Sequence, residues 1–82
     1  MAGYHLTNIP KGELGEPSKI IEEYKEWLDA HSQGSKVMEL VELSDLLGAV
    51  ESYVQNNFNM ELEDLQLMSD ITKRAFKSGV RQ

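Results

Sequence analysis

Five acidic residues fall into two short clusters whose spacing suits helices. The first cluster reads Glu22-Glu23-x-x-Glu26, and after fifteen residues (27 to 41) the second reads Glu42-x-x-Asp45. Side chains three or four residues apart on a helix lie roughly 5 to 6 Å apart at Cβ, so each cluster forms a pair of neighbouring carboxylates. Crowded carboxylates raise each other's pKa unless water or a cation compensates them. The spacing therefore points to a cation site.

The surroundings of the second cluster favour a cation over water. Glu42 and Asp45 lie among leucines, and no Lys or Arg occurs from residue 37 to residue 72. Packed helices lie about 8 to 10 Å apart, so two facing carboxylate pairs leave room for small hard cations. Mg²⁺ prefers carboxylate oxygens and fills its remaining positions with water and phosphate oxygens. The alternative is a solvated acidic face, which would be the ordinary interpretation of the first cluster taken alone.

Three predicted helices position these acids, and we expect an all-α fold. The helices should cover about residues 17–30, 36–57 and 61–77. Pro17 suits the first position of a helix, and Ser35 and Asn59 are the expected N-caps of the second and third. Residues 1–16 show no hydrophobic period and should form an arm. We therefore expect one domain over residues 1–82, with an arm (1–16) and a helical part (17–82).

The apolar pattern predicts which helix faces are buried. The first helix carries one apolar stripe, with its acids on the opposite and flanking side. The second is apolar over most of its circumference, which is typical of a central, buried helix. Three helices cannot wrap it completely, and a chain of this length buries only roughly 60% of its unfolded surface. We expect subunits to pair and complete a four-helix-bundle core. The stripe of the first helix comprises Ile20, Ile21, Tyr24, Trp27 and Leu28.

Composition excludes several classes of function. The net charge is −6, which disfavours nucleic acid and anionic membrane surfaces as partners. The chain contains no cysteine, so it has no disulfide and no zinc–thiolate site. No apolar run approaches the ~20 residues of a membrane span, and the N-terminus lacks a signal-peptide pattern. We expect a soluble, cytoplasmic protein.

Two segments carry a family resemblance. Ser18-Lys-Ile-Ile-Glu-Glu-Tyr-Lys-Glu26 and Val41-Glu-Leu-Ser-Asp-Leu-Leu47 resemble the MazG-like, all-α nucleotide pyrophosphohydrolases. That family's pattern is Glu-x-x-Glu, a spacer of variable length and Glu-x-x-Asp. It falls here on Glu23, Glu26, Glu42 and Asp45. The resemblance covers about residues 12–50, and the basic residues 73–77 are similar to the end of compact phage-type members.

The resemblance implies an activity, a cofactor and an assembly. The activity would be hydrolysis of a (deoxy)nucleoside triphosphate to the monophosphate and pyrophosphate. The expected substrate is a purine dNTP in nucleotide-pool control, during phage infection of a host cytoplasm. The four matched acids would bind Mg²⁺ or Mn²⁺, with two or more ions per site, and Glu22 would orient or deprotonate the attacking water. The protein would be a homodimer or a homotetramer built as a dimer of dimers.

Other residues could serve the substrate. The candidate phosphate contacts are Lys19, Lys73, Arg74 and Lys77. In the arm, Tyr4, Thr7 and Asn8 could contact a base edge, although most arm residues simply dock. His5 and His31 have no ligand partner at useful sequence spacing, so the sequence does not predict a metal role for them.

Two alternatives remain open at this point. A phosphoribosyl-ATP pyrophosphohydrolase would share the superfamily architecture. A non-catalytic helical oligomerisation module would use its acids only for solvation. The response of thermal stability to Mg²⁺ or Mn²⁺ separates an enzyme site from a solvated face.

Overall fold

The computed structural model describes residues 5–78, with side chains for residues 5–74, and consists of three helices and an arm. Helix α1 spans Pro17–Gln33, α2 spans Lys36–Phe58 and α3 spans Leu62–Ser78. No strand occurs within residues 5–78, which confirms the all-helical prediction. None of the helices in this range is both long and apolar enough to cross a membrane.

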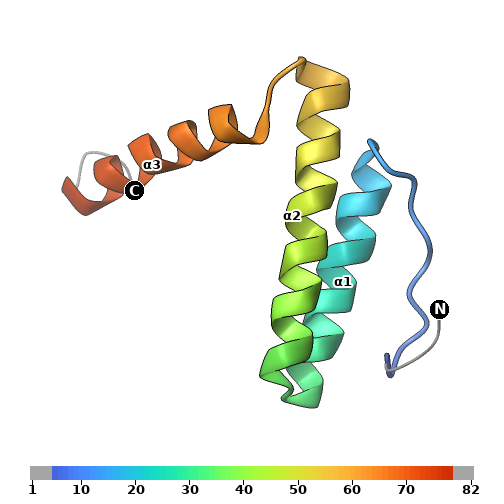
Figure 1. Ribbon diagram of the computed structural model, residues 1–82. Helices are drawn as coiled ribbons and strands as arrows, with labels where there is room; N and C mark the ends of the chain where they lie inside the picture. Colours follow the sequence, from blue (N-terminus) through green and yellow to red (C-terminus); the bar gives the residue numbers. More distant parts are fainter. Residues whose placement is uncertain (1–4, 79–82) are drawn as a thin grey trace.

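Helices α1 and α2 form an antiparallel hairpin that is closed by a two-residue turn (Figure 1). Pro17 begins α1, as predicted, and Gly34 ends it in the left-handed region (φ 75°) with its N–H donating to the carbonyl of His31 at 3.0 Å. Ser35 is the N-cap of α2, and its Oγ accepts a hydrogen bond from the Met38 N–H at 3.2 Å. Two residues are enough for this turn because Gly34 donates to a carbonyl at the end of α1 and Ser35 accepts from an amide at the start of α2.

Helix α3 leaves the far end of α2 and extends away from the hairpin (Figure 1). Asn59 adopts a left-handed conformation (φ 54°) and is the C-cap of α2, so its predicted role as N-cap of α3 is wrong. The start of α3 is held instead by Asp64, whose Oδ2 accepts the Glu61 N–H at 2.9 Å. The radius of gyration is 14.8 Å, against about 12 Å for a compact chain of this length. The single chain is therefore an open arrangement.

The arm, residues 5–16, runs back along α1 and is fixed at both ends (Figure 1). At one end, the Nδ2 atoms of Asn56 and Asn57 donate to the carbonyl of Gly15 at 3.3 and 3.1 Å. At the other, Asp29 of α1 accepts the amide protons of Leu6 and Thr7 at 2.8 and 3.1 Å. These contacts make the arm part of the fold.

The expected burial pattern is wrong for the single chain. On α1, Ile21 and Tyr24 are 51% and 47% exposed, and on α2 Leu40 is 68% exposed. Among the described side chains, the only buried apolar ones are Ala30, Ala49 and Val54. The faces that α1 and α2 turn toward each other instead contain acidic residues, so α2 is not a buried central helix here. Buried acids comprise Glu22, Glu23, Asp29 and Glu42.

The Ser35 cap should contribute measurably to stability. We expect Ser35→Ala to lower the free energy of unfolding by about 1 kcal/mol, because the Met38 N–H loses its acceptor. Ser44→Ala, at an exposed position inside α2, should be neutral or slightly stabilising. Urea denaturation followed by circular dichroism compares the two variants, and equal losses would contradict the cap assignment.

Candidate metal centre

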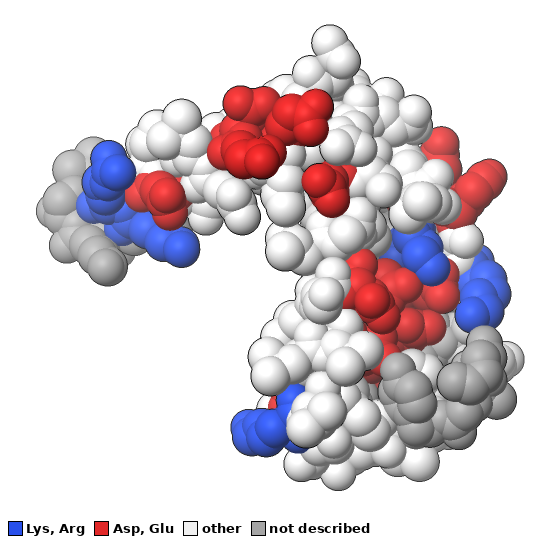
Figure 2. All heavy atoms as spheres, in the orientation of Figure 1, with Lys and Arg blue, Asp and Glu red and all other residues white. Residues whose placement is uncertain are grey.

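The two predicted carboxylate clusters meet between α1 and α2. Glu22, Glu23 and Glu42 are 2%, 5% and 1% exposed, whereas Glu26 is half-buried and Asp45 is exposed. Figure 2 shows one group of acidic atoms on the hairpin with lysine atoms at its edge, besides other acidic groups elsewhere on the surface. All five acids singled out by sequence spacing therefore belong to one cluster, and Glu42 is its most deeply buried member.

The ligand atoms of this cluster form three overlapping triads. In each triad the candidate atoms lie within 4.8 Å of one another. Two ligands of one metal ion at about 2.1 Å are separated by roughly 3 to 4 Å, so these spacings suit coordination. Glu23, Glu26 and Glu42 each belong to two triads, so the cluster offers more than one position for an ion. The triads are Glu22–Glu23–Glu26, Glu23–Glu42–Asp45 and His5–Glu26–Glu42.

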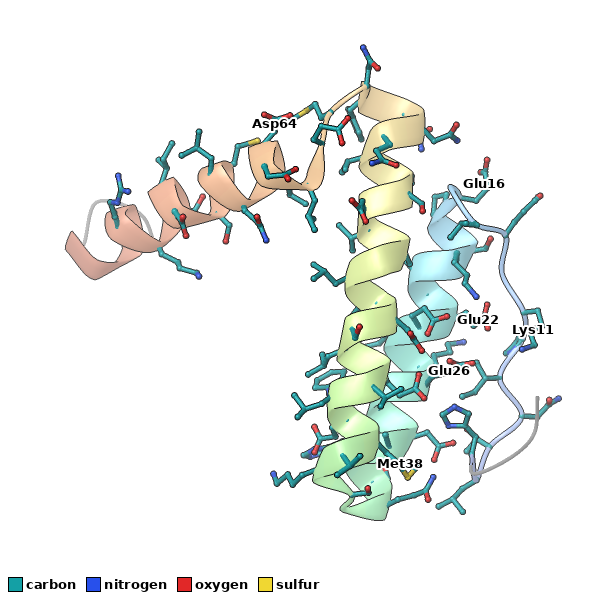
Figure 3. The ribbon with its side chains drawn as sticks, viewed as in Figure 1. Lys11, Glu16, Glu22, Glu26, Met38 and Asp64 are labelled. Carbon is teal, nitrogen blue, oxygen red and sulfur yellow. The ribbon has the colours of Figure 1, made fainter. Side chains whose placement is uncertain are left out.

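At one end of the cluster, Glu22 is surrounded by donors. Its Oε1 accepts the Gly12 N–H at 2.7 Å and lies 3.1 Å from Lys19 Nζ, and its Oε2 lies 3.8 Å from Lys11 Nζ (Figure 3). Burial alone would raise the pKa of Glu22, but the Gly12 N–H and Lys19 outweigh it and lower the pKa below its ordinary value. A side chain at position 12 would clash with the Ser18 backbone, so glycine allows this close approach. Glu22 is thus held in its ionised form.

At the centre of the cluster, Glu23 and Glu26 repel each other. Burial, followed by the charge of Glu23, raises the pKa of Glu26 to about 8. Oε2 of Glu23 lies 3.0 Å from Lys19 Nζ, but its Oε1 is buried without a hydrogen-bond partner. A proton on Glu26 could satisfy this oxygen, and so could a cation. The unsatisfied oxygen is the structural observation that fits a bound metal.

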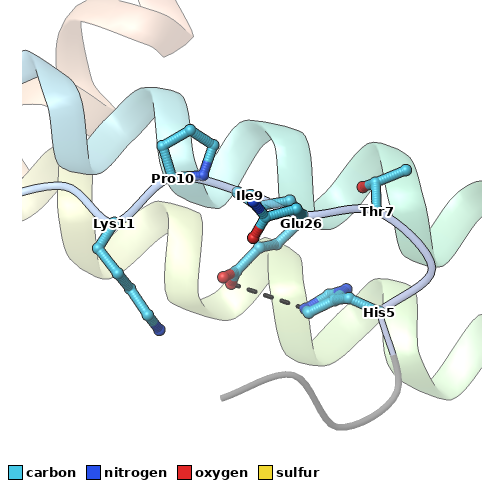
Figure 4. A pocket seen from close by; sticks show the side chains of 7 residues that line it. His5, Thr7, Ile9, Pro10, Lys11 and Glu26 are labelled. Atoms are coloured by element: carbon cyan, nitrogen blue, oxygen red, sulfur yellow. Dashed lines mark ion pairs between the residues drawn. The ribbon is translucent and has the colours of Figure 1, made fainter.

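The arm brings a histidine to the other end of the cluster. His5 Nε2 lies 3.9 Å from Glu26 Oε1 (Figure 4). The same nitrogen lies 3.5 Å from Glu42 Oε2. Sequence spacing predicts no ligand partner for His5, but the fold supplies two. The arm has no periodic pattern from which this contact could have been inferred. His31 instead lies beside Glu39, at 3.2 Å.

Asp29 is a functional candidate that the sequence interpretation missed. Its Oδ2 accepts the Leu6 and Thr7 amides and the Thr7 hydroxyl, the last at 3.1 Å. Burial would raise the pKa of Asp29, but hydrogen bonds from Gln33, Thr7 and Leu6 outweigh it and lower the pKa. Asp29 stands seven residues after Glu22, so helical spacing already placed it on the acidic face. It fixes the arm across the cluster.

A hollow of about 430 Å³ lies between the arm and Glu26 (Figure 4). This volume falls within the range of small-ligand sites, about 300 to 1,000 Å³. Thr7 and Asn8, two of the arm residues expected near a base edge, line it, whereas Tyr4 lies outside the described residues. The arm therefore forms a wall of a space beside Glu26 that is large enough for part of a nucleotide. Its other lining residues are His5, Ile9, Pro10 and Lys11.

The predicted phosphate contacts divide into two groups. Lys19 lies in the cluster, where Glu23, the largest cause, and Glu22 raise its pKa against the effect of burial. Lys73 and Arg74 are exposed on α3, which carries them away from the hairpin (Figure 1). Lys77 lies in α3 but outside the residues whose side chains are described. Of the predicted phosphate contacts whose side chains are described, only Lys19 meets the acids. Lys11, which the sequence did not single out, also lies beside Glu22.

No family model, curated protein or solved structure matches this chain. The resemblance to MazG-like enzymes thus stays a prediction, and the cluster has to be interpreted from its own geometry.

Docking of the arm should depend on the charge of Asp29. Hydrogen bonds from Gln33 and from the docked arm lower the pKa of Asp29. Docking is therefore complete above the ordinary value of 3.8 and is lost as the pH falls through the lower folded value. In metal-free buffer, we expect the amide resonances of Leu6 and Thr7 to titrate with a midpoint below 3.8. NMR of the labelled chain measures this midpoint. Asp29→Asn should abolish the titration; a midpoint above 3.8 in the unmodified chain would contradict the assignment.

Proposed function

We propose that this chain is a MazG-like, metal-dependent pyrophosphohydrolase that converts a (deoxy)nucleoside triphosphate to the monophosphate and pyrophosphate. The observation that carries the proposal is the overlap of the acidic triads at Glu23, Glu26 and Glu42, of which Glu23 and Glu42 are buried. A solvated acidic face does not bury carboxylates, so this arrangement favours a cation-binding role.

Glu23, Glu26, Glu42 and Asp45 would hold Mg²⁺ or Mn²⁺, and the overlap of triads supports two or more ions. When bound, such ions neutralise phosphate charge and lower the pKa of a coordinated water. The unsatisfied Oε1 of Glu23 and the raised pKa of Glu26 both favour occupation, because a cation compensates the repulsion that the apo cluster retains.

The chain's own residues would orient the substrate and the water. A lowered pKa makes Glu22 a weak general base, so it is better suited to orient a water than to deprotonate one. Lys19 and Lys11 lie beside it and could meet the phosphates. The hollow beside Glu26 could take the nucleoside, with Asn8 offering an amide to a base edge. The proposed substrate is a purine dNTP drawn from the nucleotide pool of a phage-infected cytoplasm.

The exposed apolar faces support assembly into a dimer, or a dimer of dimers, with a four-helix-bundle core. Large apolar side chains are exposed on all three helices, and patches of this kind commonly mark protein interfaces. A partner that covers them would supply the core that one chain lacks, and could bring Lys73, Arg74 and Lys77 of α3 toward a neighbouring cluster. Examples are Ile21, Tyr24, Leu40, Leu43, Leu47, Leu67 and Ile71.

The alternatives predict different behaviour. A phosphoribosyl-ATP pyrophosphohydrolase would use the same acids on a different substrate. A non-catalytic oligomerisation module would use the same apolar faces, but its acids would not respond specifically to divalent ions. A substrate panel of the common NTPs and dNTPs, modified purine nucleotides and phosphoribosyl-ATP, assayed for pyrophosphate, compares all three.

The carboxylates should be required for turnover but not for the helical fold. We expect Glu26→Gln and Asp45→Asn to abolish pyrophosphate release and the rise in melting temperature on adding Mg²⁺ or Mn²⁺, while the helical circular dichroism survives. Each variant removes a carboxylate ligand from the cluster and leaves a side chain of similar size.

Glu63→Gln, on the exposed first turn of α3, is the matched control and should retain both properties. Unchanged turnover in both cluster variants would refute the assignment. A metal response without turnover on any nucleotide would leave a metal-binding protein and exclude the hydrolase.

Assembly should require the apolar face of α2. We expect the chain to sediment as a multiple of 9.3 kDa and Leu43→Glu to shift it toward one chain, because a charge would be buried in the interface. Ser44→Glu changes the adjacent residue and tests whether any new charge on this helix has the same effect. A monomeric parent chain in sedimentation velocity at micromolar concentration would contradict the bundle.

A further inference from the structure

We propose that His5 is a nitrogen ligand of the metal centre and makes it select Mn²⁺ over Mg²⁺. This inference deepens the metal site of the proposed function. Nε2 of His5 lies 3.5 Å from Oε2 of Glu42 and 3.9 Å from Oε1 of Glu26. These distances are close to the spacing of ligands around one ion. The side chains of His5, Glu42 and Glu26 are 7%, 1% and 15% exposed, so the triad is largely shielded from solvent.

The two ring nitrogens of His5 face different groups. Nδ1 lies 3.6 Å from Oδ2 of Asp29, while Nε2 faces Glu26 and Glu42. Histidines that bind metals commonly direct their second ring nitrogen to a carboxylate, which sets the orientation of the ring. Asp29 also holds the backbone of Leu6 and Thr7, directly after His5. Asp29 is therefore a positioning residue for the imidazole.

The charges of the cluster show why a cation belongs at this end. The lysines contact the cluster at Glu22 and Glu23, where Lys19 lies 3.1 and 3.0 Å from their carboxylates. Oε1 of Glu23 is buried and has no hydrogen-bond partner, and Glu23 shares triads with both Glu26 and Glu42. A metal bound by His5, Glu26 and Glu42 would place positive charge beside this central carboxylate.

One nitrogen ligand changes which ions the site prefers. Mg²⁺ strongly favours oxygen ligands, whereas imidazole binds the first-row transition ions well. Mn²⁺ accepts both carboxylate and imidazole, so a site with one histidine and several carboxylates should favour it over Mg²⁺. An all-carboxylate site would lack this source of selectivity.

Pulsed EPR of the full chain loaded with Mn²⁺ tests the ligand directly. We expect a nitrogen hyperfine coupling of a directly bound imidazole in the unmodified chain, and its loss in His5→Gln. His31→Gln removes the only other histidine and should leave the coupling unchanged. Bound Mn²⁺ without nitrogen coupling, or coupling that survives in His5→Gln, would overturn the proposal. Absence of Mn²⁺ binding at millimolar concentration would overturn it as well.

Calorimetry tests the selectivity. We expect His5→Gln to weaken Mn²⁺ binding by about tenfold or more, and Asp29→Asn to weaken it in the same direction, as for groups that orient a metal ligand. In the same variants, the factor by which Mg²⁺ binding weakens should be less than a third of the factor for Mn²⁺. Equal losses for the two ions would mean that His5 only contributes charge or holds the arm, and would overturn the proposal.

The two proposals fail in distinguishable ways. Nitrogen coupling without nucleotide turnover would refute the hydrolase and leave the His5 ligand standing. Turnover that requires Glu26 and Asp45, together with Mn²⁺ that shows no nitrogen coupling, would refute the ligand and leave the hydrolase standing. Because His5 lies in the arm, unchanged helical circular dichroism of His5→Gln confirms that each comparison concerns folded protein.

Discussion

Repulsion among buried carboxylates is the constraint on which the rest of this structure depends. Glu22, Glu23 and Glu42 lie where a helical hairpin normally packs apolar side chains, and removing charges from water is unfavourable unless each is compensated. Lys19 compensates part of the charge from within α1. The remainder has to come from outside the two helices, and this requirement explains why the arm lies across them.

The arm contributes donors at two points on the acidic face. The Gly12 N–H binds Glu22, and the Leu6 and Thr7 amides bind Asp29. A glycine is needed at position 12 because the backbone comes too close to Ser18 for a side chain. The arm is thus ordered by carboxylates that would otherwise destabilise the hairpin, and its docking in turn places His5 at the cluster.

Local signals predicted most of the fold, whereas contacts between elements were harder to infer. Pro17 and Ser35 mark helix starts through their own backbone chemistry, so both positions were correct. Helical spacing also grouped Glu22, Glu23 and Glu26 correctly, but it could not tell which face meets α2. Ile21 shares an apolar stripe and was expected inside, yet the acids occupy that place in one chain. His5 could not be found because a non-periodic arm has no register on a helix.

The hairpin buries acidic side chains and exposes large apolar ones. Compensating the buried charges and covering the exposed apolar side chains are physically coupled requirements. The α1–α2 distance sets the spacing of Glu23 and Glu42, and few apolar side chains are buried within the described chain to help fix that distance. A partner that covered Leu40, Leu43 and Leu47 would also press on α2 and narrow the range of spacings that the carboxylates can adopt. A cation bound between the helices would act on the same distance from within. Covering the outer face and filling the acidic centre would therefore stabilise one hairpin geometry, and each would make the other more favourable.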